Sequence, residues 1–99
     1  MHVWGVLRPF DDWNIDRTLK TDGVYALYEG RKILYLGAAK GGEGIKGKLI
    51  SHKNNLEDEC IARATHFRYE HRNEPDSRLL ELLNEHKEAY GFLPKCNPL

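Results

Sequence analysis

Two short tyrosine–glycine motifs are the part of the sequence whose residue types and spacing could carry out chemistry. GVY, residues 23–25, and YLG, residues 35–37, each belong to an apolar run, and the segment EGR separates the two runs. A phenolate can take a proton, and a nearby cation can hold a phosphate group. Tyr25 and Tyr35 are therefore either ordinary packed side chains of a β-hairpin or the edge of an active site.

The hairpin geometry decides between these two readings. Residues 24–28 and 32–36 are rich in Val, Ile, Leu and Tyr around a glycine turn, which predicts two antiparallel strands. Side chains alternate between the faces of a strand. Tyr25 and Tyr35 lie opposite each other only if they pair directly, which requires a three-residue loop. A two-residue turn that pairs Tyr25 with Leu34 would place the tyrosines on opposite faces.

The rest of the chain supplies the elements that must position these residues. Helical spacing predicts a helix over residues 43–54, and an apolar alternation predicts a third strand over 61–70. A second helix follows Pro75 and ends at Gly91. Its predicted core side is formed by Leu79, Leu80, Leu82, Leu83 and Tyr90. The order β-β-α-β-α predicts an α+β fold, in which helices flank a small three-stranded sheet.

Length and composition restrict the class of protein. The 99 residues predict a single domain, 1–99, in which residues 1–21 are an N-terminal extension packed on the body. Within that extension, residues 3–7 are a candidate strand and Pro9 a candidate start of a short helix. The formal net charge of zero gives no global attraction to nucleic acid, although a local patch remains compatible with it.

Targeting signals and cysteine usage predict a cytoplasmic protein. The N-terminus lacks a basic segment followed by a long apolar run, and no stretch approaches the roughly 18 apolar residues of a membrane span. Cys60 and Cys96 form no CxxC pair, so free buried thiols are the expected state, and a disulfide is left open. The His and Cys residues have no zinc-ligand spacing.

With this element order, the chain resembles the GIY-YIG nuclease family. GVY resembles the first half of the motif that names the family, and YLG resembles the second half. KLISH, residues 48–52, resembles the family's helix pattern of a basic residue, Leu, two variable residues and His. LPKCN, residues 93–97, resembles its closing Pro-x-x-Asn. The resemblance covers a core over residues 22–97 and implies a GIY-YIG endonuclease-like fold.

The resemblance implies metal-dependent hydrolysis of DNA phosphodiester bonds. Tyr25 and Tyr35 take the place of the family's tyrosines, with one of them acting as the general base or orienting the water. Lys48 stands at the position of the family's arginine, where it would hold the phosphate. By its position next to the apolar stripe of the helix, His52 is either a residue that positions a tyrosine or the phosphate, or a packed histidine with one satisfied nitrogen. One Mg²⁺ or Mn²⁺ ion would be held by a helix carboxylate.

Two departures from the family pattern concern this site. Lys48 supplies a point charge in place of the planar fork of an arginine. The metal-binding carboxylate has three candidates: local similarity of DSRLLE points to Glu81, the facing of the leucines favours Asp76, and counting back from Asn97 points to Glu85. All three remain open, together with the alternative that they are solvated helix charges.

A basic segment next to these motifs predicts a surface for nucleic acid. Residues 38–55 contain four lysines, Lys40, Lys46, Lys48 and Lys53, and one acid, Glu43. The adjacent glycine-rich loop has the composition of a phosphate-contacting loop. The G-x-x-x-x-G-K-[ST] pattern of a nucleotide-binding loop is absent. A solvated helix face beside a loop is the alternative interpretation.

The sequence thus favours a DNA endonuclease of the GIY-YIG type. The alternative is a non-catalytic module that keeps the fold, has lost the Arg and Glu of the family, and binds nucleic acid or a protein. A third interpretation is a small structural protein in which the motifs are coincidental. Since the chain leaves no room for a separate DNA-binding segment, specificity is expected from a few contacts of the N-terminal 20 residues, from a homo-oligomer or from a protein partner.

Overall fold

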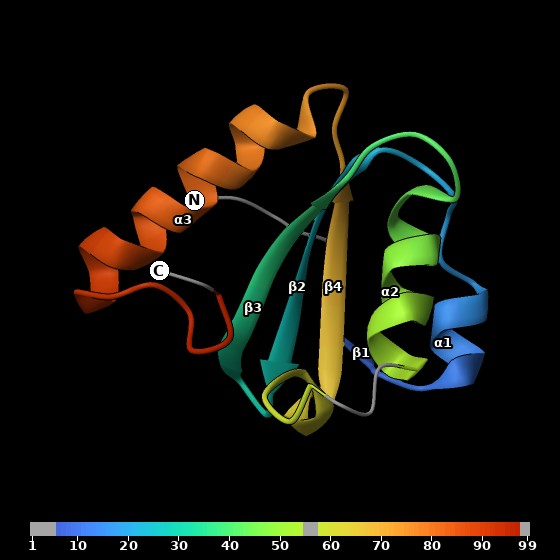
Figure 1. The fold of residues 1–99 in the computed structure, drawn as a ribbon, viewed down its shortest axis with the longest axis horizontal. Coiled ribbons are helices and arrows are strands. Elements are labelled where there is room, and N and C mark those ends of the chain that lie inside the picture. Colours follow the sequence, from blue (N-terminus) through green and yellow to red (C-terminus); the bar gives the residue numbers. More distant parts are fainter. Residues whose placement is uncertain (1–5, 55–57, 98–99) are drawn as a thin grey trace.

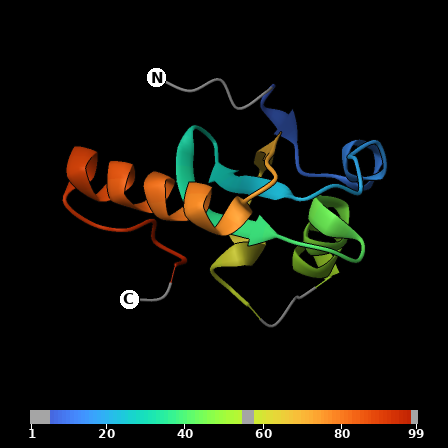
Figure 2. The ribbon, with the colours of Figure 1, turned by 90° about the horizontal axis from the view of Figure 1, so that it is seen from above.

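The computed structural model describes residues 6–54 and 58–97. Within these residues, the centre is an antiparallel sheet of four strands in the order β1-β4-β2-β3. Helices α1 and α2 cover one face of the sheet and α3 covers the other (Figures 1 and 2). The elements are β1 (Arg8–Pro9), α1 (Asp12–Asp16), β2 (Gly23–Glu29), β3 (Lys32–Ala39), α2 (Gly44–Asn54), the 3-10 turn η1 (Ile61–Arg63), β4 (His66–His71) and α3 (Pro75–Tyr90).

The α+β prediction is confirmed, and the predicted β-β-α-β-α order corresponds to β2, β3, α2, β4 and α3. The N-terminal region adds a short strand β1, paired with β4, and the one-turn helix α1, which begins at Asp12 and not at Pro9 as predicted. The predicted third strand is shorter than expected, because its first residues form η1. The candidate strand over residues 3–7 lies largely outside the described residues.

The hairpin reaches the predicted facing of the tyrosines by a different register. Glu29 pairs with Lys32, so the turn has two residues and not the expected three. A β-bulge then shifts the register, and Leu27 pairs with Tyr35 while Tyr25 pairs with Gly37. A two-residue turn alone would place Tyr25 and Tyr35 on opposite faces of the sheet. The extra residue of the bulge returns Tyr35 to the face of Tyr25. The two tyrosines therefore share a face and lie diagonally, although they are not paired directly.

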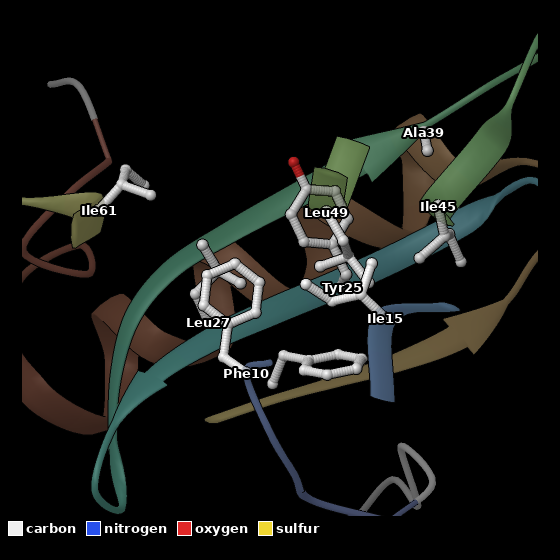
Figure 3. Close-up of a cluster of buried hydrophobic side chains, with 9 residues drawn as sticks. Phe10, Ile15, Tyr25, Leu27, Ala39, Ile45, Leu49 and Ile61 are labelled. Carbon is white, nitrogen blue, oxygen red and sulfur yellow. The ribbon is translucent and has the colours of Figure 1, made fainter. Parts of the chain in front are cut away.

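The alternation of β2 divides the core into two layers. Tyr25 and Leu27 face α1 and α2, in a cluster that also contains Phe10, Ile15, Ala39, Ile45, Leu49, Ile61 and Phe67 (Figure 3). Val24, Ala26 and Tyr28 face α3 and pack with Leu36 and Leu82. Since the sheet is covered on both faces, its central strand is apolar at nearly every position.

Helix α3 ends as the sequence predicts, but its buried side differs. Gly91 adopts a left-handed conformation with φ of 84°, and its amide donates to the carbonyl of Lys87. Leu80 and Tyr90, which were expected on the core side, are exposed, whereas Arg78 and His86 are buried. The helix buries two polar side chains because each finds a hydrogen-bond partner, Arg78 on Glu70 and His86 on the carbonyl of Phe92.

The C-terminal tail runs back along β3 and is fastened there (Figure 1). The amide of Cys96 donates to the carbonyl of Leu34, at the bulge, with an N–O distance of 2.8 Å. The Asn97 side chain accepts from the amide of Leu36 and donates to its carbonyl. Cys96 also forms a disulfide with Cys60. The expectation of free thiols was wrong, because the tail brings together two cysteines that are 36 residues apart.

Candidate active site

Tyr25, Tyr35 and His52 form one contact group between the hairpin and α2. The Tyr25 hydroxyl lies 2.7 Å from Nε2 of His52, which is a hydrogen bond. The ring centroids are 5.6 Å apart for Tyr25 and His52, 5.2 Å for Tyr35 and His52, and 6.1 Å for the two tyrosines. Strand alternation and the bulge place both tyrosines on the α2 face, and the last turn of α2 presents His52 to them.

Gly37 allows the Tyr25 ring to reach this position. Tyr25 pairs with Gly37 across the hairpin, so its ring lies over the glycine. A Cβ atom at Gly37 would stand only 2.5 Å from Cζ and the hydroxyl of Tyr25, and 2.8 Å from the Tyr35 ring. The glycine of the second motif is thus needed for close approach of the tyrosines.

The three side chains differ in their access to solvent. Tyr25 is only 1% exposed, whereas Tyr35 and His52 are half-buried. Figure 3 shows the Tyr25 ring among the apolar side chains of the α2 face. Tyr35 and His52 are therefore the members of the group that a substrate can reach, and Tyr25 lies beneath them.

Burial sets the protonation states of the group. Burial raises the pKa of the Tyr25 phenol well above its ordinary value, and the neighbouring Tyr35 raises it further by charge and by a hydrogen bond. Burial also lowers the pKa of His52 below its ordinary 6.5, and the charge of Lys48 lowers it further, against an opposing effect of Asp58. At neutral pH the group consists of a protonated Tyr25 and a neutral imidazole.

The direction of the hydrogen bond between Tyr25 and His52 depends on the tautomer of the imidazole. In the tautomer that carries its proton on Nε2, the Tyr25 oxygen accepts that proton and the second ring nitrogen, Nδ1, carries the lone pair. Nδ1 of His52 has no hydrogen-bond partner among the described residues.

The four lysines of the predicted basic surface have different surroundings. Lys48 is exposed and close enough to His52 to lower its pKa. Lys46 instead bonds the carbonyl and carboxylate of Asp16, at 3.0 and 3.4 Å. Lys53 lies over the Phe10 ring, with its Nζ 5.4 Å from the ring centroid. Lys40 is exposed in the loop before α2.

The glycine-rich loop is bonded within the protein at several of its amides. The amide of Gly41 donates to the Asp22 carboxylate at 2.8 Å, and the amide of Gly44 donates to the carbonyl of Gly41. Gly41, Gly42 and Gly44 all have positive φ, so glycine is required to shape the turn into α2. The loop orients α2, and these two bonded amides are not available to a phosphate.

The three candidate carboxylates belong to α3, on the sheet face opposite Tyr25. Glu81 is 65% exposed and accepts from Nη1 of Arg78 at 3.1 Å. Glu85 lies 3.9 Å from the same nitrogen, and Asp76 is exposed in the first turn. Since Arg78 also bonds Glu70, these glutamates belong to an ion-pair cluster on the α3 face.

A divalent cation held jointly by these carboxylates and the tyrosines does not fit this arrangement. The sheet separates the two groups, and Glu81 is engaged by Arg78, which it shares with Glu70. Over residues 6–54 and 58–97, no group of three or more His, Cys, Asp or Glu side chains is placed to hold a metal ion. The residues that do come together are Tyr25, Tyr35, His52 and Lys48.

Two contributors to the site were not singled out from the sequence for these roles. Gly37 was noted only as part of the motif, and its steric role follows from the register, which the bulge sets. Asp58 was not recognised at all. It caps η1 by accepting from the amides of Cys60 and Ile61, and its charge acts on His52. An Asp three residues before the first residue of a short turn gives a capping signal, but no signal for proximity to His52.

Solved structures of known proteins share this fold. Two are of the GIY-YIG N-terminal endonuclease domain of UvrC from Thermotoga maritima, each a tyrosine-to-phenylalanine point mutant bound to its catalytic divalent cation. The TM-score is 0.62 for each, with 18% and 17% sequence identity. The alignments cover 88% of this chain and 93% of the other chains. No family profile and no curated protein matches the sequence. The chain therefore has the GIY-YIG endonuclease fold.

Proposed function

We propose that this protein hydrolyses phosphodiester bonds of DNA at the site formed by Tyr25, Tyr35, His52 and Lys48. The observation that carries the proposal is the contact group itself: two tyrosines and a neutral histidine within hydrogen-bond and ring-contact distance, beside an exposed lysine. The shared fold supports it, but function depends on the site and not on the fold.

The residues suggest a division of roles. His52 Nδ1 accepts a proton from the attacking water, whose oxygen bonds to phosphorus while the bond from phosphorus to the leaving ester oxygen breaks. The Tyr35 hydroxyl and the Lys48 ammonium face the negative charge on the phosphate oxygens. Solvent protonates the leaving oxygen. Tyr25, which is buried, is a positioning residue that fixes the tautomer and orientation of His52.

A second candidate function is binding of nucleic acid without cleavage. Two observations favour it: a lysine replaces the family's arginine at position 48, and the carboxylates of α3 lie on the other face of the sheet in ion pairs with Arg78. In that case Lys48 and the exposed loop residue Lys40 contribute a salt-dependent attraction to phosphate. The two functions differ in whether a bond is cut.

The test is a cleavage assay on plasmid and branched DNA, with Mg²⁺, with Mn²⁺ and with a chelator. The wild type is expected to nick, and His52→Ala to lose at least about 100-fold in rate, as for loss of a general base. Tyr25→Phe is expected to lower kcat more than KM, since it acts through His52. Tyr69→Phe is the matched control, because Tyr69 packs against the same core cluster from β4, whereas His52 bonds Tyr25.

Lysine and carboxylate variants separate the remaining alternatives. Lys48→Arg is expected to raise the rate by restoring a bidentate donor, whereas Lys46→Arg, on the same helix but bonded to Asp16, leaves it unchanged. Glu81→Ala, Asp76→Ala and Glu85→Ala test the carboxylate role, and a loss of metal-dependent nicking in one of them assigns the metal to that residue. No nicking by any variant, together with salt-sensitive DNA binding, supports the binding module.

A further inference from the structure

A second surface lies at the hairpin end of the sheet, on the α3 face. It is an open groove of about 770 Å³, lined by residues from the β2–β3 hairpin, from β4 and from the end of α3. The residues that matter are Tyr28, Arg31, Lys32, Arg68, Tyr90 and Phe92. Tyr28 faces α3 and Tyr25 faces α2, so this groove and the tyrosine–histidine site are on opposite sides of the sheet.

Two exposed aromatic rings are held at this groove by the end of α3. Tyr90 is 63% exposed and Phe92 is 58% exposed. Between them lies His86, with ring centroids 4.7 Å from Tyr90 and 6.0 Å from Phe92. The left-handed turn at Gly91 reverses the chain, and His86 Nδ1 bonds the Phe92 carbonyl at 2.7 Å. The rings are thus fixed in position while their outer surfaces stay open to solvent.

The groove also carries cations that have no acidic partner within ion-pair distance among the described residues. These cations are Arg31 and Lys32 of the hairpin and Arg68 of β4. Arg68 lies 5.3 Å from the Tyr28 ring centroid, and its buried Nε has no hydrogen-bond partner in the described part of the chain. The one acid in the lining, Glu29, is 4.0 Å from Arg63. The groove therefore has a positive charge that calls for an anionic partner.

We propose that this groove binds single-stranded nucleic acid, with unpaired bases stacked on Tyr90 and Phe92 and phosphates on the cations of the groove. Open aromatic faces next to cations are the two components of single-strand binding, since each base offers a face for stacking and the backbone offers the charge. A duplex offers charge but no free base faces. This inference rests on the proposed function, which makes nucleic acid the partner. The new part is that the bound nucleic acid contains an unpaired segment.

The test measures, by fluorescence anisotropy, how a fluorescein-labelled oligothymidylate of about ten nucleotides binds to protein that carries His52→Ala. The His52→Ala substitution removes cleavage by the proposed active site, so the anisotropy reports binding whether or not the active-site proposal is correct. Tyr90→Ala and Phe92→Ala are each expected to weaken binding by about 5- to 150-fold, the range for loss of one stacked base. Arg68→Gln is expected to reduce the slope of log affinity against log salt by about 0.7.

Matched controls distinguish stacking from general effects. Trp13→Ala removes an equally exposed aromatic ring on α1 and is expected to leave binding unchanged, and Tyr90→Phe is expected to retain it. An abasic oligonucleotide of equal charge and a duplex of equal length are expected to bind more weakly than oligothymidylate. Equal binding of the abasic strand, equal losses in Trp13→Ala and Tyr90→Ala, or no binding of any oligonucleotide would each overturn the proposal.

Discussion

Tyr25 shows how burial changes the role that a residue type suggests. A tyrosine next to a phosphate invites the assignment of a phenolate base, but burial raises the pKa of Tyr25 and keeps its proton in place at neutral pH. The same burial lowers the pKa of His52 and keeps its imidazole neutral. The group that can accept a proton at neutral pH is therefore His52, and Tyr25 holds the imidazole in place through their hydrogen bond.

The pH dependence of cleavage tests this assignment at the residue scale. Because the pKa of His52 is lowered below 6.5, its neutral form persists to more acidic pH than for a free histidine. The acid limb of kcat/KM is expected to have its midpoint below 6.5, with activity lost as the pH falls through it. Lys48→Met removes one cause of the lowering, so the midpoint is expected to move up.

Titration of the His52 ring protons by NMR checks the same shift without relying on activity. An upward shift in Lys48→Met that is absent from Lys46→Met is the expected result. A His52 midpoint at or above 6.5 in the wild type would contradict the assignment.

At the scale of the element, α3 is joined to the sheet by charge as well as by leucines. Arg78 is only 3% exposed, and its Nε donates to the Glu70 carboxylate of β4 at 2.9 Å. Burial by itself would raise the pKa of Glu70, but hydrogen bonds from Arg72 and Arg78 outweigh it and lower that pKa. The ionised carboxylate thus contributes stability above its unfolded pKa, and this contribution is lost as the pH falls through the lowered, folded value.

Arg78→Met is expected to destabilise the protein by about 2 kcal/mol, because it leaves the partly buried Glu70 with Arg72 alone. Arg72→Met is the matched control. Arg72 is 44% exposed, so its loss is expected to cost less than about 1 kcal/mol. Urea unfolding at pH 7 measures both variants. Equal effects of the two substitutions would show that burial of Arg78 is not what gives the ion pair its energy.

At the scale of the whole molecule, the C-terminal tail closes the structure around the edge strand. It bonds β3 at Leu34 and Leu36 and is linked to the segment before η1 through Cys60 and Cys96. These contacts hold the bulged part of β3, on which the common facing of the tyrosines depends. The tail therefore supports the site without contributing a side chain to the tyrosine–histidine group.

The disulfide gives a prediction for the whole chain. It closes a loop of 36 residues, so its removal in Cys60→Ser/Cys96→Ser is expected to cost about 3 to 4 kcal/mol from loop-closure entropy. Urea unfolding with and without reductant measures the effect, and reductant is expected to change the wild type but not the double variant. Titration of two free thiols in the native, non-reduced protein would contradict the bond.

The sequence by itself determined the α+β class, the main elements and the identity of the tyrosine and histidine residues, because strand alternation, helix spacing and glycine stops are local signals. Only the tertiary structure decided how they meet. The bulge at Leu34 replaced the expected three-residue loop, the tail paired two distant cysteines, and α3 carried its carboxylates to the face opposite Tyr25. Each of these outcomes depends on packing between segments far apart in the chain, which no local pattern records.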